Sequence, residues 1–166
     1  MKINRTIFII VALACIISLG ISVYAQFYQG VEPCPLCIAQ RFIIMLIGIC
    51  AAMFAIHNPR GVLLQIYGVI ITGLAIFCAK IAGHHIWLLN LPPAQQPTSC
   101  SMPMSILFQK LSVFEFMQTI LRGDAECAKV SWKIAMVPAP YAVVILCSTI
   151  IILSLYVILV DILSST

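Results

Sequence analysis

The sequence predicts an all-α fold, a four-helix transmembrane bundle with a long loop that carries a short amphipathic surface helix. The chain of 166 residues is 63% hydrophobic and only 8% charged, whereas soluble domains carry about 25% charged residues. Four apolar stretches, at about residues 6–25, 38–56, 62–81 and 141–160, approach the roughly 20 residues that a spanning helix needs. The long segment 83–140 separates the last two.

The first span follows two positive residues, Lys2 and Arg5. Its apolar stretch is longer than the roughly 7–15 residues typical of a secretory signal peptide, so we expect it to be retained as a span. With the other spans it would form one integral membrane domain over residues 1–166. An even number of spans places both termini on one side, and the positive residues favour the cytoplasmic side.

The second span begins with a Cys-x-x-Cys motif, from Cys34 to Cys37. Such a pair can form a reducible disulfide or bind a metal. Pro35 suits the first turn of a helix, which places Cys37 near the helix N-terminus, and Arg41 follows one turn later on the same face. A helix N-terminus and a positive charge both favour a thiolate. Arg41 could instead only extend to the membrane surface, but its register with Cys37 favours a functional role.

The third span forms a hairpin with the second, because a short polar turn at residues 57–61 joins them. It ends with His84-His85-Ile86-Trp87, on the same side of the membrane as the motif. Adjacent histidines point to different faces of a helix, so these two would not bind one metal together. Two interpretations stay open for them: an amphipathic interfacial residue, or a polar contact for a carbonyl-bearing ligand near Cys37 and Arg41.

The long loop, about residues 83–140, begins with a polar, proline-rich stretch from Leu91 to Pro103 that is typical of extended chain. Cys100 lies in this stretch, where the thiolate of a partner could reach its sulfur, although a plain solvated linker is the alternative. Residues 105–121 have the periodicity of an amphipathic helix lying on the membrane surface. An acidic, turn-like segment then ends at Cys127.

The eight cysteines divide by position into two groups. One group lies at or in the loops at about 26–37 and 83–140, on the same face of the membrane: Cys34, Cys37, Cys100 and Cys127. This grouping indicates disulfide exchange, which suits an oxidising compartment. The other group lies inside the spans and is expected to pack as small hydrophobic residues: Cys15, Cys50, Cys78 and Cys147.

Composition and spacing argue against several other functions. The net charge of +4 is dispersed, with no basic run that would indicate nucleic-acid binding. A structural zinc site usually combines two close cysteine pairs, and no second Cys-x-x-Cys is present, so no metal site is predicted. No βαβ pattern accompanies the motif, which argues against a thioredoxin-like domain.

With these motifs the sequence resembles the disulfide bond formation protein B (DsbB) family of bacterial inner-membrane quinone reductases. The segments that carry the resemblance are Pro33–Arg41, His85–Leu88, Cys100 and Cys127–Trp132, and the similarity covers nearly the whole chain. The resemblance implies a four-helix bundle with both termini in the cytoplasm and with the cysteine-bearing loops in the periplasm.

The resemblance also implies a cofactor, a quinone such as ubiquinone or menaquinone. Cys34 and Cys37 would form the disulfide that the bound quinone reoxidises, with Cys37 beside the quinone ring. Arg41 would match the arginine of the family that contacts the quinone, and His85 would be a second residue near it.

The implied partner is a periplasmic DsbA-like oxidase with a thioredoxin fold. Cys100 and Cys127 would form the second disulfide, and the reduced partner would attack Cys100. Electrons would pass from the thiols of the partner to Cys100–Cys127, then to Cys34–Cys37 and then to the quinone.

Two other functions remain as alternatives. A quinone redox enzyme of the vitamin K epoxide reductase type also pairs a Cys-x-x-Cys with a helical bundle, but its active pair is expected late in the chain. A non-enzymatic transporter or channel would need charged groups within its spans. The one acidic residue near a span is Asp161, at the end of the fourth span.

Overall fold

The computed structural model describes residues 2–30, 33–92, 95, 113–123, 127, 133–134 and 137–165. Four long helices make up most of this part of the chain: α1 (Lys2–Tyr28), α2 (Pro35–His57), α3 (Val62–Leu89) and α6 (Ala139–Ser165). A shorter helix, α5 (Val113–Arg122), and two short strands, β1 (Lys133–Ile134) and β2 (Val137–Pro138), lie between α3 and α6 in the sequence. The predicted all-α class is therefore confirmed.

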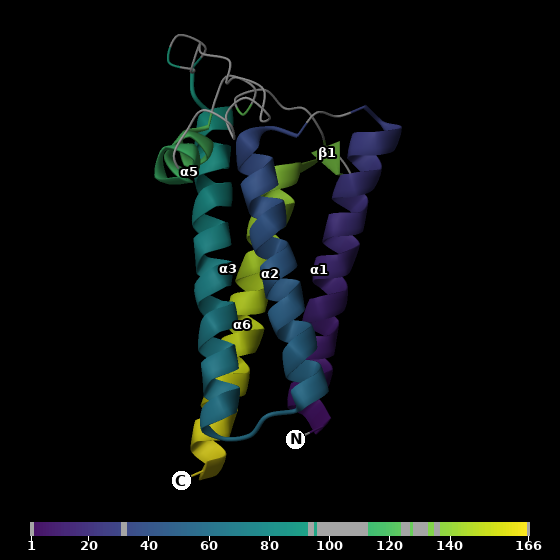
Figure 1. Ribbon diagram of the computed structural model, residues 1–166, viewed down its shortest axis with the longest axis vertical. Helices are drawn as coiled ribbons and strands as arrows, with labels where there is room; N and C mark the ends of the chain where they lie inside the picture. The colour runs from purple at the N-terminus through teal and green to yellow at the C-terminus, as the bar shows by residue number, and fades with distance from the viewer. Residues whose placement is uncertain are drawn as a thin grey trace.

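The four long helices run side by side, with both termini at the same end of the bundle (Figure 1). Each contains a stretch long and apolar enough to cross a membrane: Asn4–Tyr28, Pro35–His57, Val62–Leu89 and Ala139–Leu163. Many of their large apolar side chains, Ile56 and Val62 among them, are exposed on the outside of the bundle. In a bilayer these side chains would contact lipid, so the chain is a multi-pass membrane protein.

The start of α2 follows from its sequence. Cys34 has an extended backbone, and its sulfur accepts a hydrogen bond from the backbone N–H of Cys37 at 3.4 Å. Pro35 occupies the first turn, where its missing N–H costs nothing. At the other end Asn58 adopts the left-handed conformation, with φ of 44°, that commonly ends a helix. The redox motif is thus held in a helix cap.

The third helix is longer than predicted. It continues past residue 81, the predicted end of the span, to Leu89, and Asn90 caps it by donating its backbone N–H to Ile86 O at 3.2 Å. His84 and His85 therefore lie within a regular helix, before the loop begins. Because helical φ and ψ fix which way each side chain points, the two histidines are directed to different surroundings.

Close packing joins the helices in sequence around the bundle, with α1 on α2, α2 on α3 and α3 on α6. At the α3–α6 contact, a Cβ added to Gly68 would lie 2.7 Å from Ile158, so only glycine permits this approach. Nearby, Thr72 donates to Ser154 Oγ and Ser154 donates to Gly68 O, each at 3.0 Å. These bonds satisfy hydroxyl groups that would be costly to bury alone.

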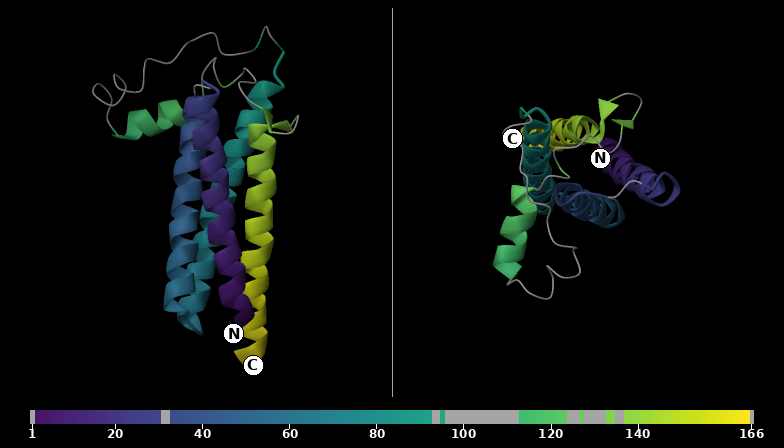
Figure 2. Two further views of the ribbon diagram at one scale, coloured as in Figure 1. Left: turned by 90° about the vertical axis from the view of Figure 1, so that its right-hand side faces the viewer. Right: turned by 90° about the horizontal axis from the view of Figure 1, so that it is seen from above.

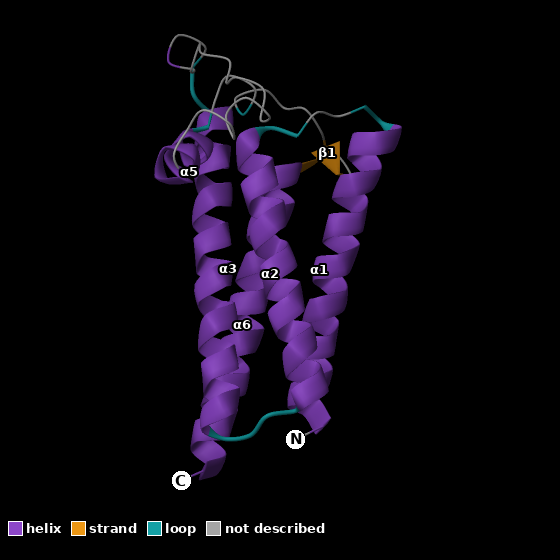
Figure 3. Ribbon diagram, in the orientation of Figure 1, coloured by secondary structure: helices purple, strands orange, loops and turns teal. Residues whose placement is uncertain are grey.

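Helix α5 lies across the direction of the long helices, at the end of the bundle opposite the termini (Figure 2). Its sequence is amphipathic, as predicted, although it begins at Val113; residues 105–112 of the predicted helix lie outside the described residues. The strands β1 and β2 form a small antiparallel pair at the same end (Figure 3), which the sequence did not predict. This end of the bundle carries the Cys-x-x-Cys motif.

Candidate functional site

The two motif cysteines lie in contact at the N-terminus of α2. The Cys34 thiol is 3.0 Å from the Cys37 sulfur and donates to it. Cys34 is buried and Cys37 is partly exposed. A pair of sulfurs at this separation needs only a small movement to form a disulfide bond of about 2.05 Å. The local geometry therefore fits a dithiol that cycles between reduced and oxidised forms.

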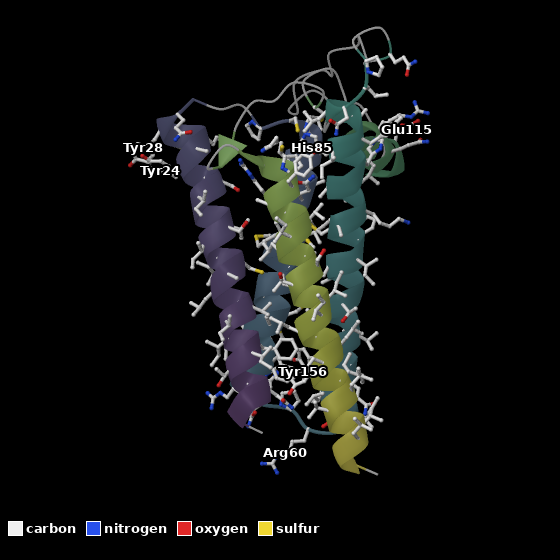
Figure 4. All side chains as sticks on the ribbon, turned by 180° about the vertical axis from the view of Figure 1, so that it is seen from behind. Tyr24, Tyr28, Arg60, His85, Glu115 and Tyr156 are labelled. Atoms are coloured by element: carbon white, nitrogen blue, oxygen red, sulfur yellow. The ribbon has the colours of Figure 1, made fainter. Side chains whose placement is uncertain are left out.

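A histidine from α3 completes this group. His85 is buried, and its Nε2 lies 3.9 Å from the Cys34 sulfur. Figure 4 shows His85 pointing into the bundle near the end opposite Arg60. The neighbouring His84 is directed elsewhere, and its Nε2 contacts Arg122 O of α5 at 3.1 Å. The predicted divergence of the two histidines is confirmed, and only His85 faces the dithiol.

Arg41 lies one turn along α2 from Cys37 and reaches across to α1. Its Nη1 donates to Gln26 Oε1 at 2.6 Å, and its Nη2 donates to Ser22 O at 3.1 Å. Its charge is also within electrostatic range of the Cys37 sulfur. A guanidinium group has five N–H donors, so these bonds leave donors for a ligand. Arg41 thus ties α1 to α2 beside the dithiol.

Cys127 lies against Cys34, although the two are far apart in the sequence. It is completely buried, and a hydrogen bond links its side chain with that of Cys34. This bond, the bond to Cys37 and burial together raise the pKa of the Cys34 thiol far above its usual range. Cys34 therefore stays protonated in the reduced protein, between two sulfurs to which it can bond.

The glycine before this cysteine shapes the contact. Gly123 directly follows α5 and has φ of +72°, in the region that favours glycine. A Cβ at this position would lie 2.8 Å from Leu88 of α3 and 2.9 Å from Leu36 of α2. The Cys127 sulfur would be 3.5 Å from this added Cβ. Gly123 is thus packed closely against α2 and α3, next to Cys127.

The remaining cysteines differ in position. Cys100 lies outside the described residues, so its predicted pairing with Cys127 stays a prediction. Cys15, Cys78 and Cys147 are completely buried inside the bundle, and Cys50 is partly buried against the same core. Their burial in the apolar core agrees with the packing role expected from the sequence.

One residue of the site was missed in the sequence. Gln40 is buried on the core side of α2, one turn after Cys37. Its Nε2 and the Nδ1 of His85 are the buried side-chain polar atoms without a hydrogen-bond partner in the part of the chain that the structure describes. The signal was present, because a glutamine three residues from a reactive cysteine interrupts an apolar run. Leaving a buried polar group without a hydrogen bond costs about 1–3 kcal/mol of stability, so both nitrogens are candidate hydrogen-bonding contacts for a ligand.

Comparison with known proteins places this site in context. The family model described as "Disulfide bond formation protein DsbB" matches residues 4–157. A protein from Methylococcus capsulatus named "Disulfide bond formation protein B" is 36% identical over 141 residues, which is 85% of each chain. Proteins of the same name from Marinobacter nauticus and Chromobacterium violaceum are 35% and 32% identical over more than nine-tenths of each chain. No solved structure matched the chain.

Proposed function

Because the chain belongs to the disulfide bond formation protein B family, we propose that this membrane protein is a thiol:quinone oxidoreductase. It reoxidises a periplasmic dithiol oxidase with a thioredoxin fold and passes the electrons to a membrane quinone. The observation that carries the proposal is the meeting of a dithiol, a third cysteine and two unpartnered polar nitrogens at one end of the bundle. The family match also favours this function over the two alternatives raised by the sequence.

The first half of the reaction is disulfide exchange. A thiolate of the reduced partner attacks Cys100 of a Cys100–Cys127 disulfide and releases Cys127 as a thiolate. Cys127 lies against Cys34, so it can attack that sulfur when Cys34 is bonded to Cys37. The Cys34–Cys37 bond breaks and Cys37 leaves as the thiolate. The second partner thiol then attacks the disulfide between the partner and Cys100, which releases the oxidised partner and the Cys100 thiolate. Cys100 in turn attacks Cys127 of the Cys127–Cys34 disulfide, which restores Cys100–Cys127 and leaves Cys34 and Cys37 reduced.

The second half returns the pair to the disulfide. Cys34 and Cys37 together lose two electrons and two protons as their sulfurs bond. A bound quinone would accept the two electrons and the two protons. On the protein side, Cys37 is the partly exposed sulfur of the pair, and the Arg41 charge lies within its electrostatic range. His85 contacts Cys34 and is the group placed to accept a proton from that thiol.

The residues around the dithiol fit a carbonyl-bearing ring. The amide N–H groups of Gln40 and a protonated Nδ1 of His85 are donors without partners, while a quinone has two acceptor oxygens. Arg41 adds free N–H donors and a positive charge. Gln40, Arg41 and His85 would therefore hold the quinone head group.

The direction of the protein in the membrane belongs to the same proposal. The end with Arg5 and Arg60 faces the cytoplasm, following the preference of positive residues for that side, and both termini lie at this end (Figure 1). The dithiol end faces the periplasm of a bacterial inner membrane, where a disulfide partner is available and thiols become oxidised.

A single-turnover experiment tests the proposal. In protein with Cys100 and Cys127 replaced by serine, the Cys34–Cys37 pair is reduced and then mixed with quinone without oxygen. The expected result is the loss of quinone absorbance together with the loss of two free thiols per chain. Cys37→Ser should abolish both changes. Loss of thiols without reduction of quinone would refute the proposed acceptor.

Gln40 supplies a sharper version of this experiment. Gln40→Leu keeps the size of the side chain but removes its donors, so it should weaken quinone binding about 5- to 100-fold, as expected for one lost buried hydrogen bond. Thr72→Val is a matched control, because it removes a polar group from the core of α3 at the contact with α6. The control should leave quinone binding unchanged.

A further inference from the structure

The reduced site has the ligand set of a metal centre. One ligand atom each from Cys34, Cys37 and His85 lies within 4.8 Å of the others. We propose that the reduced protein binds one thiophilic divalent cation, such as Zn²⁺ or Cd²⁺, through the sulfurs of Cys34 and Cys37 and the Nε2 of His85. The sequence argued against a metal because it contains one cysteine pair, but folding brings the third ligand from α3.

The distances agree with tetrahedral coordination after small shifts. With Zn–S of about 2.3 Å and Zn–N of about 2.0 Å, a tetrahedral site has sulfurs about 3.8 Å apart and a sulfur–nitrogen separation of about 3.5 Å. The observed separations are 3.0 Å between the sulfurs and 3.9 Å between the Cys34 sulfur and His85 Nε2. Each differs from the ideal value by less than about 1 Å, which a change in side-chain torsion supplies.

The environment suits a cation that prefers sulfur. The site lies at the end of a bundle with few charged residues, so two thiolates and a neutral imidazole give a neutral complex with a divalent ion. Cys127 contacts Cys34 but does not belong to the group of ligand atoms that lie within 4.8 Å of one another. The fourth position is therefore left for water, as in zinc sites with three protein ligands.

Oxidation state decides whether the cation binds. Binding requires both sulfurs to be thiolates, so any proton still on Cys34 or Cys37 is released when the cation binds. In the disulfide form the same sulfurs are bonded to each other and no longer offer thiolates. The cation would thus hold the enzyme in its reduced form and prevent reoxidation, and a chelator would reverse this inhibition.

Cadmium titration tests the proposal, with thiolate-to-cadmium absorption in the ultraviolet as the measurement. The protein carries serine at Cys100 and Cys127 and alanine at the four cysteines inside the spans, so only the motif sulfurs remain. The reduced protein should bind one Cd²⁺ per chain, and the oxidised protein should bind none. Equal absorption in both forms would overturn the proposal, and this comparison leaves all three proposed ligands unchanged.

The role of the histidine is tested with a matched pair of variants. His85→Ala removes the third ligand and should weaken Cd²⁺ binding by more than about tenfold, since even indirect supports of a metal ligand change affinity by that factor. His84→Ala removes the adjacent histidine, which faces Arg122 instead, and should leave the affinity unchanged. If the two variants bind Cd²⁺ equally well, the cation is held by the sulfurs alone and the proposed site is wrong. His85→Gln, a smaller disturbance to the core, should show the same loss.

Discussion

At the scale of single residues, the position of Cys34 explains much of the site. Its sulfur accepts the N–H of Cys37, its thiol donates to the Cys37 sulfur, and Cys127 and His85 contact it from two other elements. This set of neighbours is the basis of the proposed exchange, in which Cys34 is bonded in turn to Cys37 and to Cys127. The motif and its position at a helix start were predictable from the sequence, because proline and helix-end chemistry are local. The contact with Cys127 was not, since it depends on the packing of a distant turn.

The raised pKa of Cys34 gives a test by pH. The group stays a thiol as the pH rises through the usual range of thiol ionisation, and alkylation needs the thiolate. In reduced protein that keeps Cys34, Cys37 and Cys127 but lacks Cys100, Cys34 should remain largely unmodified by iodoacetamide up to about pH 9. Cys127→Ala removes the principal cause of the shift and should move the midpoint of labelling to lower pH. A midpoint near about 8.5 in both proteins would contradict the account.

Arg41 has two possible roles, which kinetics can separate. Arg41→Met keeps much of the apolar stem but removes every donor, and should raise the KM for quinone about 10- to 100-fold, as expected for a lost hydrogen bond to a charged group. Exchange between the partner and Cys100–Cys127 should persist. Arg41→Lys should fall between, because an ammonium group cannot reproduce the planar guanidinium.

Gln26→Leu is the control for Arg41. It removes one of the two hydrogen bonds from Arg41 to α1 but leaves the guanidinium and its bond to Ser22 O in place. If Arg41 serves the quinone, this control raises KM far less than Arg41→Met does. Equal effects of the two variants would show that Arg41 acts only as a tie between the helices.

At the scale of elements, local signals predicted the helices better than they predicted their ends. The second span was predicted at about 38–56, but the proline of its first turn correctly indicated that the helix begins at Pro35. The third span was ended too early, because glycine and two histidines interrupt its apolar run although the helix continues to Leu89. Gln40 was not predicted as a site residue, because one glutamine changes the hydropathy of a span little. Its burial and the lack of a hydrogen-bond partner for its Nε2 appear only in the folded structure.

The turn after α5 offers a test at this scale. Gly123→Ala imposes a residue with a Cβ on φ of +72° and presses against Leu36 and Leu88. A left-handed conformation costs a non-glycine residue about 1–2 kcal/mol, so Cys127 should lose its close contact with Cys34 for part of the time. Transfer from Cys100–Cys127 to Cys34–Cys37 should slow about 5- to 30-fold, measured by rapid quenching. Direct reduction of quinone by chemically reduced Cys34–Cys37 should not change.

A second glycine serves as the control for Gly123. A Cβ added to Gly83 meets nothing within 4 Å, and its backbone is helical. Gly83→Ala should therefore leave the transfer rate unchanged. A transfer rate that is also unchanged in Gly123→Ala would show that the turn does not position Cys127.

At the scale of the whole molecule, the described cysteines divide by position: Cys34, Cys37 and Cys127 lie together beside the start of α2, and Cys15, Cys50, Cys78 and Cys147 lie within the long helices. Composition alone predicted the four spans, since charge is scarce and the apolar stretches are long enough to cross a bilayer. The same division predicts the effect of a combined substitution. Replacing Cys15, Cys50, Cys78 and Cys147 with alanine should keep turnover within about twofold while lowering the melting temperature, because it leaves small cavities in the core. Turnover that disappears while the protein stays folded would assign one of them to the reaction.

The central claim, that electrons pass through Cys37 to a quinone, is tested most directly by stoichiometry. Purified protein is supplied without oxygen with a reduced thioredoxin-fold dithiol partner and a limited amount of quinone, and both products are measured over time. The account predicts one quinol for each partner disulfide, because each conversion transfers two electrons, and no quinol with Cys37→Ser. Partner disulfide formed without a matching amount of quinol, or an undiminished rate in Cys37→Ser, would contradict it.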